Sequence, residues 1–321
     1  MGRLEELRIN AYLSEVARGY KNNSFIAETL FPTIYSELEK IDIFQFNKEA
    51  FQMYDTERAI RANSNVISPQ GFSKHTATLT EHDLAYPIDY REEEESKKVK
   101  LQIHATNVVT EGLKLKHEKQ CADLAQNPEN YSTDNKIVLS GSSQFSKKQS
   151  DPVGVIDDAK NAICRNIGQD PNTMVIGQEV WERIKRHPKL KDMISDNQNK
   201  ILTLQLLKEF FEIENIVIGK TIFTDLNNKF SRVWGNNIIL AYVPQYTSRT
   251  EYDPTYGYTI RKKDALQVDE YQKEGNKVKY IRATDIYTPF LVGAEAGYLI
   301  SNVIDPSDPP YNNQEDNSNG K

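Results

Sequence analysis

Apolar and polar positions divide the first forty residues into a short amphipathic stretch and a dense apolar cluster. Residues 3–18 carry apolar side chains at helical spacing with Arg and Glu between them, which predicts a short helix. Its apolar face consists of Leu4, Leu7, Ala11 and Leu13. The cluster follows in residues 22–36, "NNSFIAETLFPTIYS", where Pro32 interrupts it. Its large apolar residues are Phe25, Ile26, Leu30 and Phe31.

The segment after the cluster offers it almost no core to join. "ELEKIDIFQF" is typical of a strand. Residues 47–86 then carry scattered apolar residues with short alternations and a polar stretch at Ser64–Gly71. This pattern predicts a two-stranded excursion with its tip at that stretch and its end at Pro87. Because an isolated hairpin is only marginally stable in water, we expect the excursion to lie on another molecule.

A long helix is predicted from about Asp89 to Asn127. Glu92–Glu95 crowd its start and lysines lie toward its end, an order that complements the helix dipole. The stretch "VKLQIHA" alternates like a strand, so the first turns are open to either structure. A helix of about 35 residues would be roughly 50 Å long and would run through the molecule as a spine.

The pattern changes after a predicted linker at residues 128–150, which contains one short strand. From Asp151, a predicted helix cap, helical and strand-like segments alternate, which predicts a mixed α/β unit. Residues 256–286 are rich in strands with a turn at "KEGNK". "YTPFLVGAEAGYLISNVID" is interpreted as a terminal strand pair, and the polar tail is predicted to be disordered.

Composition and charge narrow the class of protein. The chain has 321 residues, of which 38% are apolar and 27% charged, and its formal net charge is −6. These values are typical of a soluble globular protein without general affinity for nucleic acid. No apolar run approaches the roughly 20 residues of a membrane span, and the charged N-terminus lacks a secretory or myristoylation pattern. Cys121 and Cys164 have no metal-site spacing, which favours folding in a reducing cytoplasm.

One string resembles a nucleotide-binding motif. Gly219-Lys220-Thr221 could end a phosphate-binding loop, but Glu214 stands where the motif needs its first Gly. The residues that follow predict a strand rather than the required helix. The sequence therefore favours a turn or bulge at this string.

The remaining polar residues predict no catalytic, cofactor or metal site. The five histidines have no metal-ligand spacing, and His104 and His117 are predicted to lie on the surface of the long helix. No nucleophile elbow or dinucleotide fingerprint is present. A chain with an apolar cluster, a thin projection, a spine and no such site is expected to be a protein of assembly rather than an enzyme. Its binding energy would then come from burial between subunits.

Several segments, taken in order, resemble the major capsid proteins of tailed bacteriophages. "NSFIAETLFPTIYSELEKIDIFQFNKEAF" is similar to that family's arm and the start of its extended loop, and "DTERAIRANSNV" to the Arg-rich part of the loop. "LSGSSQFSKKQSDPVGVIDDAKNAI" and "PNTMVIGQEVWERIKRHPKLKDMI" resemble the start of its axial domain. "VWGNNIILAYVP", "YGYTIRKK" and "AGYLISNVID" resemble its closing segments, so the similarity spans about residues 20–304.

The resemblance implies an α+β fold, the Hong Kong-type phage capsid fold. This fold has an N-terminal arm, an extended β-hairpin loop, a peripheral domain with a long spine helix, and a mixed α/β axial domain. The corresponding ranges are the arm at 1–38, the loop at 39–88, the peripheral domain at 89–150 and 285–305, the axial domain at 151–284, and a disordered tail at 306–321.

The resemblance also implies a structural function. Family members form hexamers and pentamers that close into an icosahedral shell around double-stranded DNA. The chain is therefore expected in the virion, assembled in the cytoplasm of a bacterial host. Its expected partners are other copies of itself, a separate scaffolding protein, a portal and, as in some relatives, a decoration protein. Contact with DNA would be non-specific, and no cofactor, metal or membrane is implied.

Two groups of residues are candidates for contacts between subunits. The apolar cluster would attach the arm to a peripheral domain, either that of its own chain or that of a neighbouring subunit. The alternative is an ordinary core contact within the chain. This group is Phe25, Ile26, Leu30 and Phe31. Arg58 and Arg61 in the loop could meet acidic groups on the next subunit, or remain solvated.

Two rival functions remain at this point. An encapsulin-like nanocompartment shell shares the fold and would enclose cargo enzymes instead of a genome. An α/β enzyme would use residues 151–245 as its catalytic domain and would need a pocket with convergent polar groups.

Overall fold

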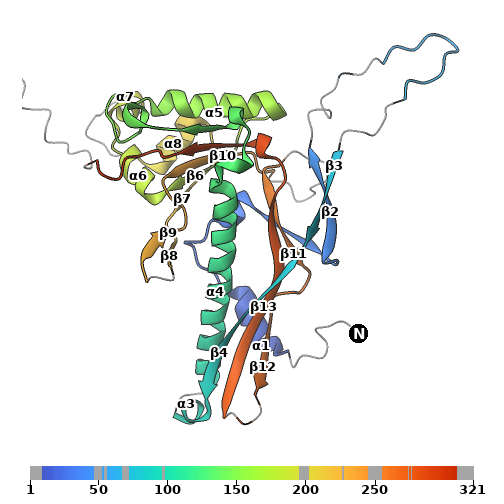
Figure 1. Cartoon of the computed structure of the whole chain (residues 1–321), viewed down its shortest axis with the longest axis vertical. Helices are drawn as coiled ribbons and strands as arrows, with labels where there is room; N and C mark the ends of the chain where they lie inside the picture. Colours follow the sequence, from blue (N-terminus) through green and yellow to red (C-terminus); the bar gives the residue numbers. More distant parts are fainter. Residues whose placement is uncertain are drawn as a thin grey trace, which may run out of the picture.

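A long helix lies along one β-sheet and reaches a second β-sheet at its upper end (Figure 1). The computed structural model describes residues 9–46, 53, 56–66, 72–95, 98–194, 202–225, 228–244, 255–273, 275 and 277–308. The helix, α4 (Lys98–Gln126), follows the short helix α3 (Tyr90–Glu95). Its 29 residues make it about 43 Å long. The predicted spine is confirmed, and "VKLQIHA" is helical.

The lower sheet, which we call the spine sheet, packs against α4. Its strands are β1 (Thr33–Ser36), β11 (Gly257–Lys262), β13 (Val278–Leu291), β12 (Gln267–Gln272) and β4 (Thr80–Asp89). The long strand β13 pairs with β11 and β12 along one edge and with β4 along the other. α4 and α1 (Ala11–Gly19) pack together against this sheet, where Leu13, Val109 and Ile281 are buried.

The upper sheet, which we call the helix-flanked sheet, is buried on both faces. Its strands are, in spatial order, β5 (Lys136–Val138), β14 (Gly297–Ser301), β10 (Asn237–Ala241), β6 (Thr173–Gly177) and β7 (Asn215–Gly219). The helices of this region are α5 (Pro152–Ile167), α6 (Gln178–Ile184), α7 (Pro188–Ile194) and α8 (Leu204–Phe211). Because successive strand residues point to opposite faces, Met174 and Ile176 pack with these helices while Val175 packs with the end of α4.

The predicted excursion is a two-stranded hairpin at its base. β2 (Lys40–Phe46) pairs antiparallel with β3 (Phe72–Thr78). Residues 56–66 stand away from the rest of the molecule (Figure 1), and the predicted tip lies partly outside the described residues. A smaller hairpin, β8 (Ile222–Thr224) with β9 (Phe230–Arg232), projects below the helix-flanked sheet.

The first helix is shorter in the described residues than the sequence pattern predicted. α1 begins at Ala11, with Asn10 as its N-cap, and Leu4 and Leu7 lie outside the described residues. Leu13 is buried as expected, but Ala11 is exposed, because α1 turns Leu13 and Ala17 toward the spine sheet.

Three local expectations are wrong. Pro87 does not end the excursion, because the excursion hairpin ends with β3 at Thr78 and Pro87 lies inside β4 of the spine sheet; β4 is paired on one side only and tolerates a position without an N–H. The terminal segments are not a strand pair, because β13 and β14 belong to different sheets. Asp151 precedes α5 as expected, but its side chain accepts no capping hydrogen bond.

The expected domain ranges do not coincide with the sheets. β13 runs without a break across the boundary placed between residues 284 and 285. β11 and β12, expected in the axial range, pair with β13 in the spine sheet. β14, expected in the peripheral range, lies in the helix-flanked sheet beside β10.

Candidate functional site: the anchor of the N-terminal arm

The apolar cluster after α1 is buried within its own chain. Leu30 and Phe31 have no exposed surface, Ile26 is 9% exposed and Phe25 is half-buried. The cluster includes the one-turn helix α2 (Ala27–Leu30) and joins a core formed by α4 and one face of the helix-flanked sheet. A core contact within the chain therefore accounts for three of the four residues, and their contact with a neighbouring subunit stays a prediction.

A buried carboxylate on α4 holds the start of this segment. Glu118 is 1% exposed and accepts hydrogen bonds from the backbone N–H groups of Ile26, at 3.0 Å, and Ala27, at 2.8 Å. The indole Nε1–H of Trp234 donates to the same carboxylate at 2.6 Å. Burial raises the pKa of Glu118, although these hydrogen bonds oppose the shift. We call Ser24–Phe31, with Glu118 and Trp234, the arm anchor.

The arm continues from the anchor into the spine sheet. β1 runs parallel to β11, with Thr33 opposite Thr259. The ring of Phe31 lies 5.5 Å from that of Tyr256, centre to centre. A Cβ at Gly257 would approach the Phe31 ring to 2.6 Å, so only glycine leaves room for this packing. The apolar cluster therefore links both sheets.

The string Gly219-Lys220-Thr221 is a turn between β7 and β8, as expected. A Cβ at Gly219 would lie 2.3 Å from the Trp234 side chain, so this glycine makes room for the indole that binds Glu118. The Thr221 hydroxyl donates to the backbone carbonyl of Ser24 at 2.7 Å. The string therefore supports the arm anchor.

A polar cluster lies deeper between α4 and the spine sheet. His117, predicted at the helix surface, is only 6% exposed; its Nε2 lies 2.7 Å from the hydroxyl of Thr259. That prediction is wrong because β11 and β13 cover this side of α4, whereas His104 is exposed as expected. Burial lowers the pKa of His117 to about 3, and the nearby cation Arg261 adds to the shift. The imidazole is therefore neutral near pH 7.

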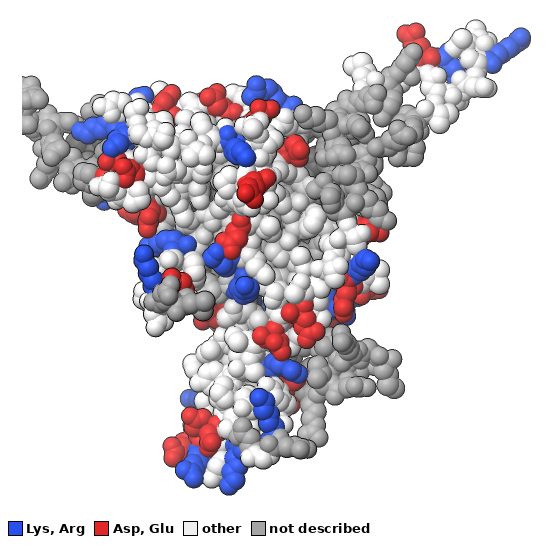
Figure 2. Space-filling model, in the orientation of Figure 1, with Lys and Arg blue, Asp and Glu red and all other residues white. Residues whose placement is uncertain are grey.

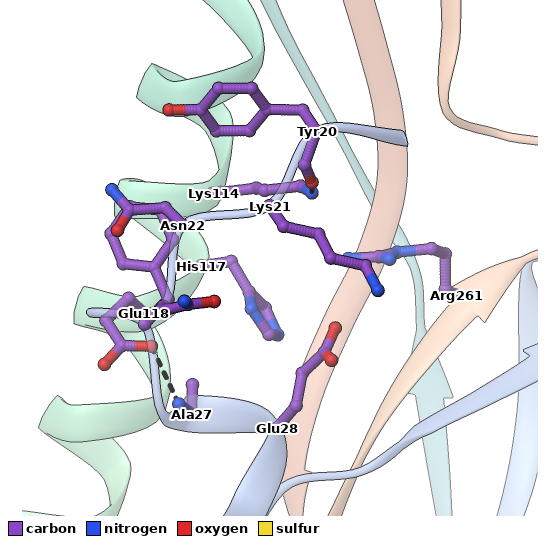
Figure 3. A pocket seen from close by; sticks show the side chains of 11 residues that line it. Tyr20, Lys21, Asn22, Ala27, Glu28, Lys114, His117, Glu118 and Arg261 are labelled. Carbon is purple, nitrogen blue, oxygen red and sulfur yellow. Dashed lines mark hydrogen bonds between the residues drawn. The ribbon is translucent and has the colours of Figure 1, made fainter. Parts of the chain in front are cut away.

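A cavity of about 360 Å³ opens beside the anchor (Figure 3). Lys21, Lys114 and Arg261 line it together with Glu28. The ammonium of Lys114 donates to the backbone carbonyl of Tyr20. Burial lowers the pKa of Lys114, the direction expected for a cation partly removed from water.

The two loop arginines lie apart from the anchor. Arg58 and Arg61 are exposed in the excursion, where a turn joins Ala59 to Ala62. The Arg58 guanidinium donates to the backbone carbonyl of Ala62, and Arg61 has a positive φ of 69°. Both side chains are exposed, and their contact with a next subunit stays a prediction.

Sequence reasoning did not identify Glu118, Thr221 or Gly257 as part of a site. The available signal for Glu118 is its spacing: it stands one helical turn before Ala122 and two before Ala125, both fully buried. A carboxylate in a buried helical stripe needs donors. The sequence could not show that those donors come from the arm and from Trp234.

The described residues hold no group of His, Cys, Asp and Glu that could bind a metal ion. Within the same residues, no helix is long and apolar enough to cross a membrane. The arm anchor combines apolar packing, a buried carboxylate and backbone donors, which is the chemistry of a structural contact.

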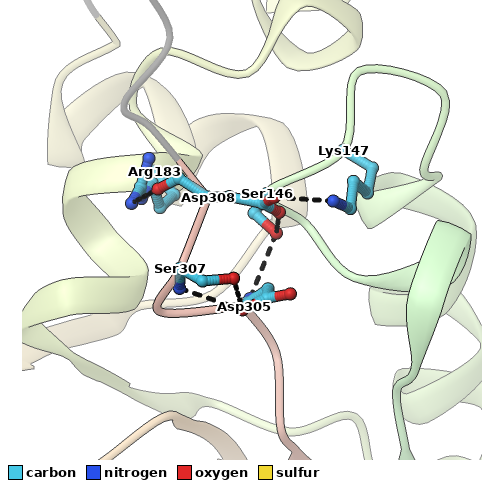
Figure 4. Close-up of polar contacts among 6 residues, drawn as sticks. All are labelled: Ser146, Lys147, Arg183, Asp305, Ser307 and Asp308. Carbon is cyan, nitrogen blue, oxygen red and sulfur yellow. Dashed lines mark hydrogen bonds and ion pairs between the residues drawn. The ribbon is translucent and has the colours of Figure 1, made fainter.

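The C-terminal end of the described chain is held by a second polar cluster (Figure 4), which we call the C-terminal clasp. Ser146 donates to one carboxylate oxygen of Asp308 at 2.6 Å, and Lys147 pairs with the other at 2.6 Å. The guanidinium of Arg183 donates to the backbone carbonyl of Asp308. The bond with Lys147 lowers the pKa of Asp308, and Ser146 adds to the shift.

Comparisons by sequence and by structure both find phage proteins. The profile of the family described as phage major capsid protein E matches residues 61–284. The major capsid protein of Burkholderia phage BcepMu is 47% identical over 307 residues, which cover 94% of this chain and 99% of that protein. A crystal structure of a phage-related protein from Bordetella bronchiseptica RB50 has a TM-score of 0.79 and 30% identity, covering 94% of this chain and 99% of its own.

A more distant likeness is to the SrpI encapsulin of Synechococcus elongatus PCC 7942. The TM-score is 0.54 at 11% identity, over 94% of this chain and 98% of the encapsulin. At that identity the likeness is one of fold alone.

Proposed function

The chain belongs to the phage major capsid protein E family, and we propose that its copies assemble as hexamers and pentamers into an icosahedral shell around double-stranded DNA. Membership of the family confirms the resemblance found in the sequence, with its Hong Kong-type α+β capsid fold. The chain is thus a structural component of a phage virion. Formation of capsomers, closure of the shell and enclosure of DNA are the parts that we propose.

The excursion carries this proposal. Met53, Ile60 and Val66 are at least 90% exposed, in a segment that stands away from both cores of its own chain. Large apolar side chains exposed on a projection of this kind are expected where another molecule covers the surface. In a shell of identical subunits, that molecule is the neighbouring copy. Many weak repeated contacts of this kind would together stabilise a closed assembly.

The two sheets suggest how the domains of the capsid fold map onto the chain. We assign the spine sheet with α1 and α4 to the peripheral domain, and the helix-flanked sheet with α5–α8 to the axial domain. This assignment moves β11 and β12 to the peripheral domain and β5 and β14 to the axial domain, relative to the ranges expected from the sequence.

The arm supports assembly by a rigid attachment in this proposal. Ile26, Leu30 and Phe31 fix it to its own subunit, which leaves Phe25 and the loop residues Arg58 and Arg61 to contact the next one. Deletion of residues 1–35 is therefore not a clean test of assembly, because it would also remove part of the subunit's core.

The proposed assembly also involves other proteins and DNA. A separate scaffolding protein, a portal and a decoration protein are the partners that the family suggests. Contact with packaged DNA would be non-specific, since the sequence carries no base-reading motif, and it would be weakened by salt, since it would come from Lys and Arg on the inner face of the shell. Assembly would take place in the cytoplasm of the bacterial host.

Electron microscopy of the purified protein tests the proposal. The protein would be expressed with and without the neighbouring phage genes and imaged in negative stain. Capsomer rings or closed shells are expected in at least one condition, and the Arg58→Glu, Arg61→Glu variant is expected to form fewer of them. A compact monomer in both conditions would overturn the assembly proposal.

An encapsulin-like shell is the alternative function; it would have the same fold but would enclose cargo enzymes instead of DNA. The chain is 47% identical to a phage major capsid protein but only 11% identical to an encapsulin, which favours a phage capsid over an encapsulin shell. Shells that contain a cargo enzyme and no nucleic acid would reverse this choice. Among the described residues of the range 151–245, no observation supports the catalytic alternative.

A further inference from the structure

A groove rich in cations lies between the arm and the spine sheet. The cavity of Figure 3 continues into a second cavity of about 620 Å³, and the two share Tyr20, Lys21, Glu28, Lys114 and Arg261. We call the pair the basic groove. Its cationic residues are Arg18, Lys21, Lys114, Arg261, Lys262 and Lys263.

The charge of the groove is opposite to that of the chain as a whole. Six cations face it in a protein whose formal net charge is −6. The carboxylates that line it are Glu28, Asp264 and Glu118, and Glu118 already accepts three donors of the arm anchor. Cations concentrated in a hollow raise the local concentration of anionic groups. The groove is therefore suited to receive carboxylates.

Several groove cations already have partners at its rim. Arg261 pairs with the buried Asp285 at 3.3 Å, and Lys262 pairs with Glu39 at 2.5 Å. Lys21 and Lys114, by contrast, form no ion pair with a described carboxylate. Both line the shared part of the groove, so an incoming carboxylate could pair with them without displacing a described carboxylate.

The described residues also contain a dense group of exposed carboxylates. Glu92–Glu95 form four consecutive acidic positions in α3, at the lower end of the molecule (Figure 2). Glu92 accepts from the backbone of Asp89, and Glu93 pairs with Lys279 at 3.7 Å. Glu94 and Glu95 are exposed, and no hydrogen bond or ion pair joins their side chains to another described residue.

One chain cannot bring these two surfaces together. Sixteen residues of α4 separate Lys98, next to α3, from Lys114 in the groove, which is about 24 Å along a rigid helix. A second copy has no such restriction. We propose that the basic groove of one subunit receives the acidic helix α3 of another subunit, a contact that rests on the proposed assembly of this chain.

Charge reversal tests the contact. Glu94→Lys with Glu95→Lys reverses the acidic end, and Lys21→Glu with Lys263→Glu reverses exposed positions of the groove without touching Lys114. Each pair is expected to lower shell yield about tenfold at fixed protein concentration, a loss equal to about 1.4 kcal/mol of association free energy. The chain with all four substitutions restores complementarity and is expected to regain its shells.

Matched controls separate the contact from net charge. Asp157→Lys with Asp158→Lys changes the charge as much as the acidic-end variant, on the exposed side of α5. Arg165→Glu with Lys229→Glu matches the groove variant at exposed sites outside the groove. Both controls are expected to assemble like the wild type.

A second measurement reads the contact directly. Carbodiimide joins a carboxylate to an amine without a spacer, so it is expected to link Glu94 or Glu95 to Lys21 or Lys114. Assemblies mixed from isotopically light and heavy chains would show by mass spectrometry that the link is between subunits. The same reaction on concentrated soluble protein applies if the wild type forms no shells, a result that would overturn the proposed assembly separately.

Three outcomes would overturn the inference. Unchanged shell yield in both reversal variants would show that the contact is absent. Loss without recovery in the four-substitution chain would show that the two surfaces do not meet. Recovery of the acidic-end variant by Arg58→Glu with Arg61→Glu would assign α3 to the extended loop instead.

Discussion

The N-terminal arm and the C-terminal end of the described chain are attached by different physical means. At the arm anchor, apolar side chains are fully buried and the carboxylate of Glu118, 1% exposed, accepts donors from two segments. At the C-terminal clasp, the carboxylate of Asp308 lies near the surface and is held by Lys147 and Ser146. Both attachments use a carboxylate, but only the carboxylate of Glu118 is removed from water.

The pKa values of the two carboxylates move in opposite directions for that reason. Burial disfavours the charged form and raises the pKa of Glu118, whereas the Lys147 ammonium favours the charged form and lowers the pKa of Asp308. The arm anchor is therefore part of the core of the subunit. The clasp is a surface attachment that salt and acid can weaken without disturbing that core.

The largest effect is expected from a cavity in the arm anchor. Phe31→Ala removes a fully buried ring that packs on Tyr256, and should lower the free energy of unfolding by about 3–5 kcal/mol. Urea unfolding of the purified subunit measures this change. Leu38→Ala is the control, since Leu38 is 68% exposed and should change stability by less than about 0.5 kcal/mol. Equal effects would show that the arm is not part of the core.

A smaller loss is expected when only the carboxylate of the anchor changes. Glu118→Gln keeps the shape but replaces one acceptor oxygen by an amide donor that faces another donor. The buried group left without a partner should cost about 1–3 kcal/mol in the same unfolding measurement. Asp123→Asn, on an exposed side of α4 where Asp123 pairs with Lys119, should cost at most about 1 kcal/mol. If Glu118→Gln left the free energy of unfolding unchanged, Glu118 would not be part of the anchor.

The two carboxylates should also differ in their pH dependence. The pKa of Glu118 is raised on folding, so its contribution to stability is greatest below its unfolded value, about 4.3, and falls as pH rises toward its folded pKa. The pKa of Asp308 is lowered, so its contribution is present above its unfolded value, about 3.9, and is lost as pH falls through its folded pKa.

Thermal unfolding of wild type and variants at several pH values tests these signs. The advantage of the wild type over Glu118→Gln should shrink as pH rises from about 4 toward neutrality. Its advantage over Asp308→Asn should instead shrink as pH falls below about 4. If both stability differences changed with pH in the same direction, the contrast between a buried and a solvent-screened carboxylate would be wrong.

The smallest effect is expected at the clasp near neutral pH. Asp308→Asn should leave the unfolding midpoint almost unchanged, because surface ion pairs contribute little in water. Hydrogen exchange at residues 303–308 should become faster in the variant, and high salt should produce the same change in the wild type. Exchange in the arm anchor should not respond to salt. A salt-sensitive anchor would indicate that its carboxylate is not removed from water.

Strong local periodicity let the sequence predict the elements that depend on few long-range contacts. The spine helix, the two-stranded base of the excursion and the turn at Gly219-Lys220-Thr221 are confirmed. The order of similar segments predicted the family, which the matches to known capsid proteins confirm. The sequence also identified the apolar cluster as important, without a partner for it.

Pairing across the chain accounts for the errors. His117 stands on a helix face that looked polar, yet β11 and β13 cover it. β13 and β14 are neighbours in sequence but separate in space, because Ala294–Ala296 form a short turn that carries the chain from one sheet to the other. No local pattern distinguishes a strand that pairs with its neighbour from one that pairs elsewhere.

The sequence by itself determined the elements of this protein, its lack of a recognisable catalytic motif and its family, because these follow from local spacing and from the order of segments. Only the tertiary structure decided that the arm is anchored on its own subunit by Glu118, that six cations share one groove, and that Asp308 holds the C-terminal end. Each of these depends on residues far apart in the chain whose burial and partners arise only when the sheets and α4 pack together.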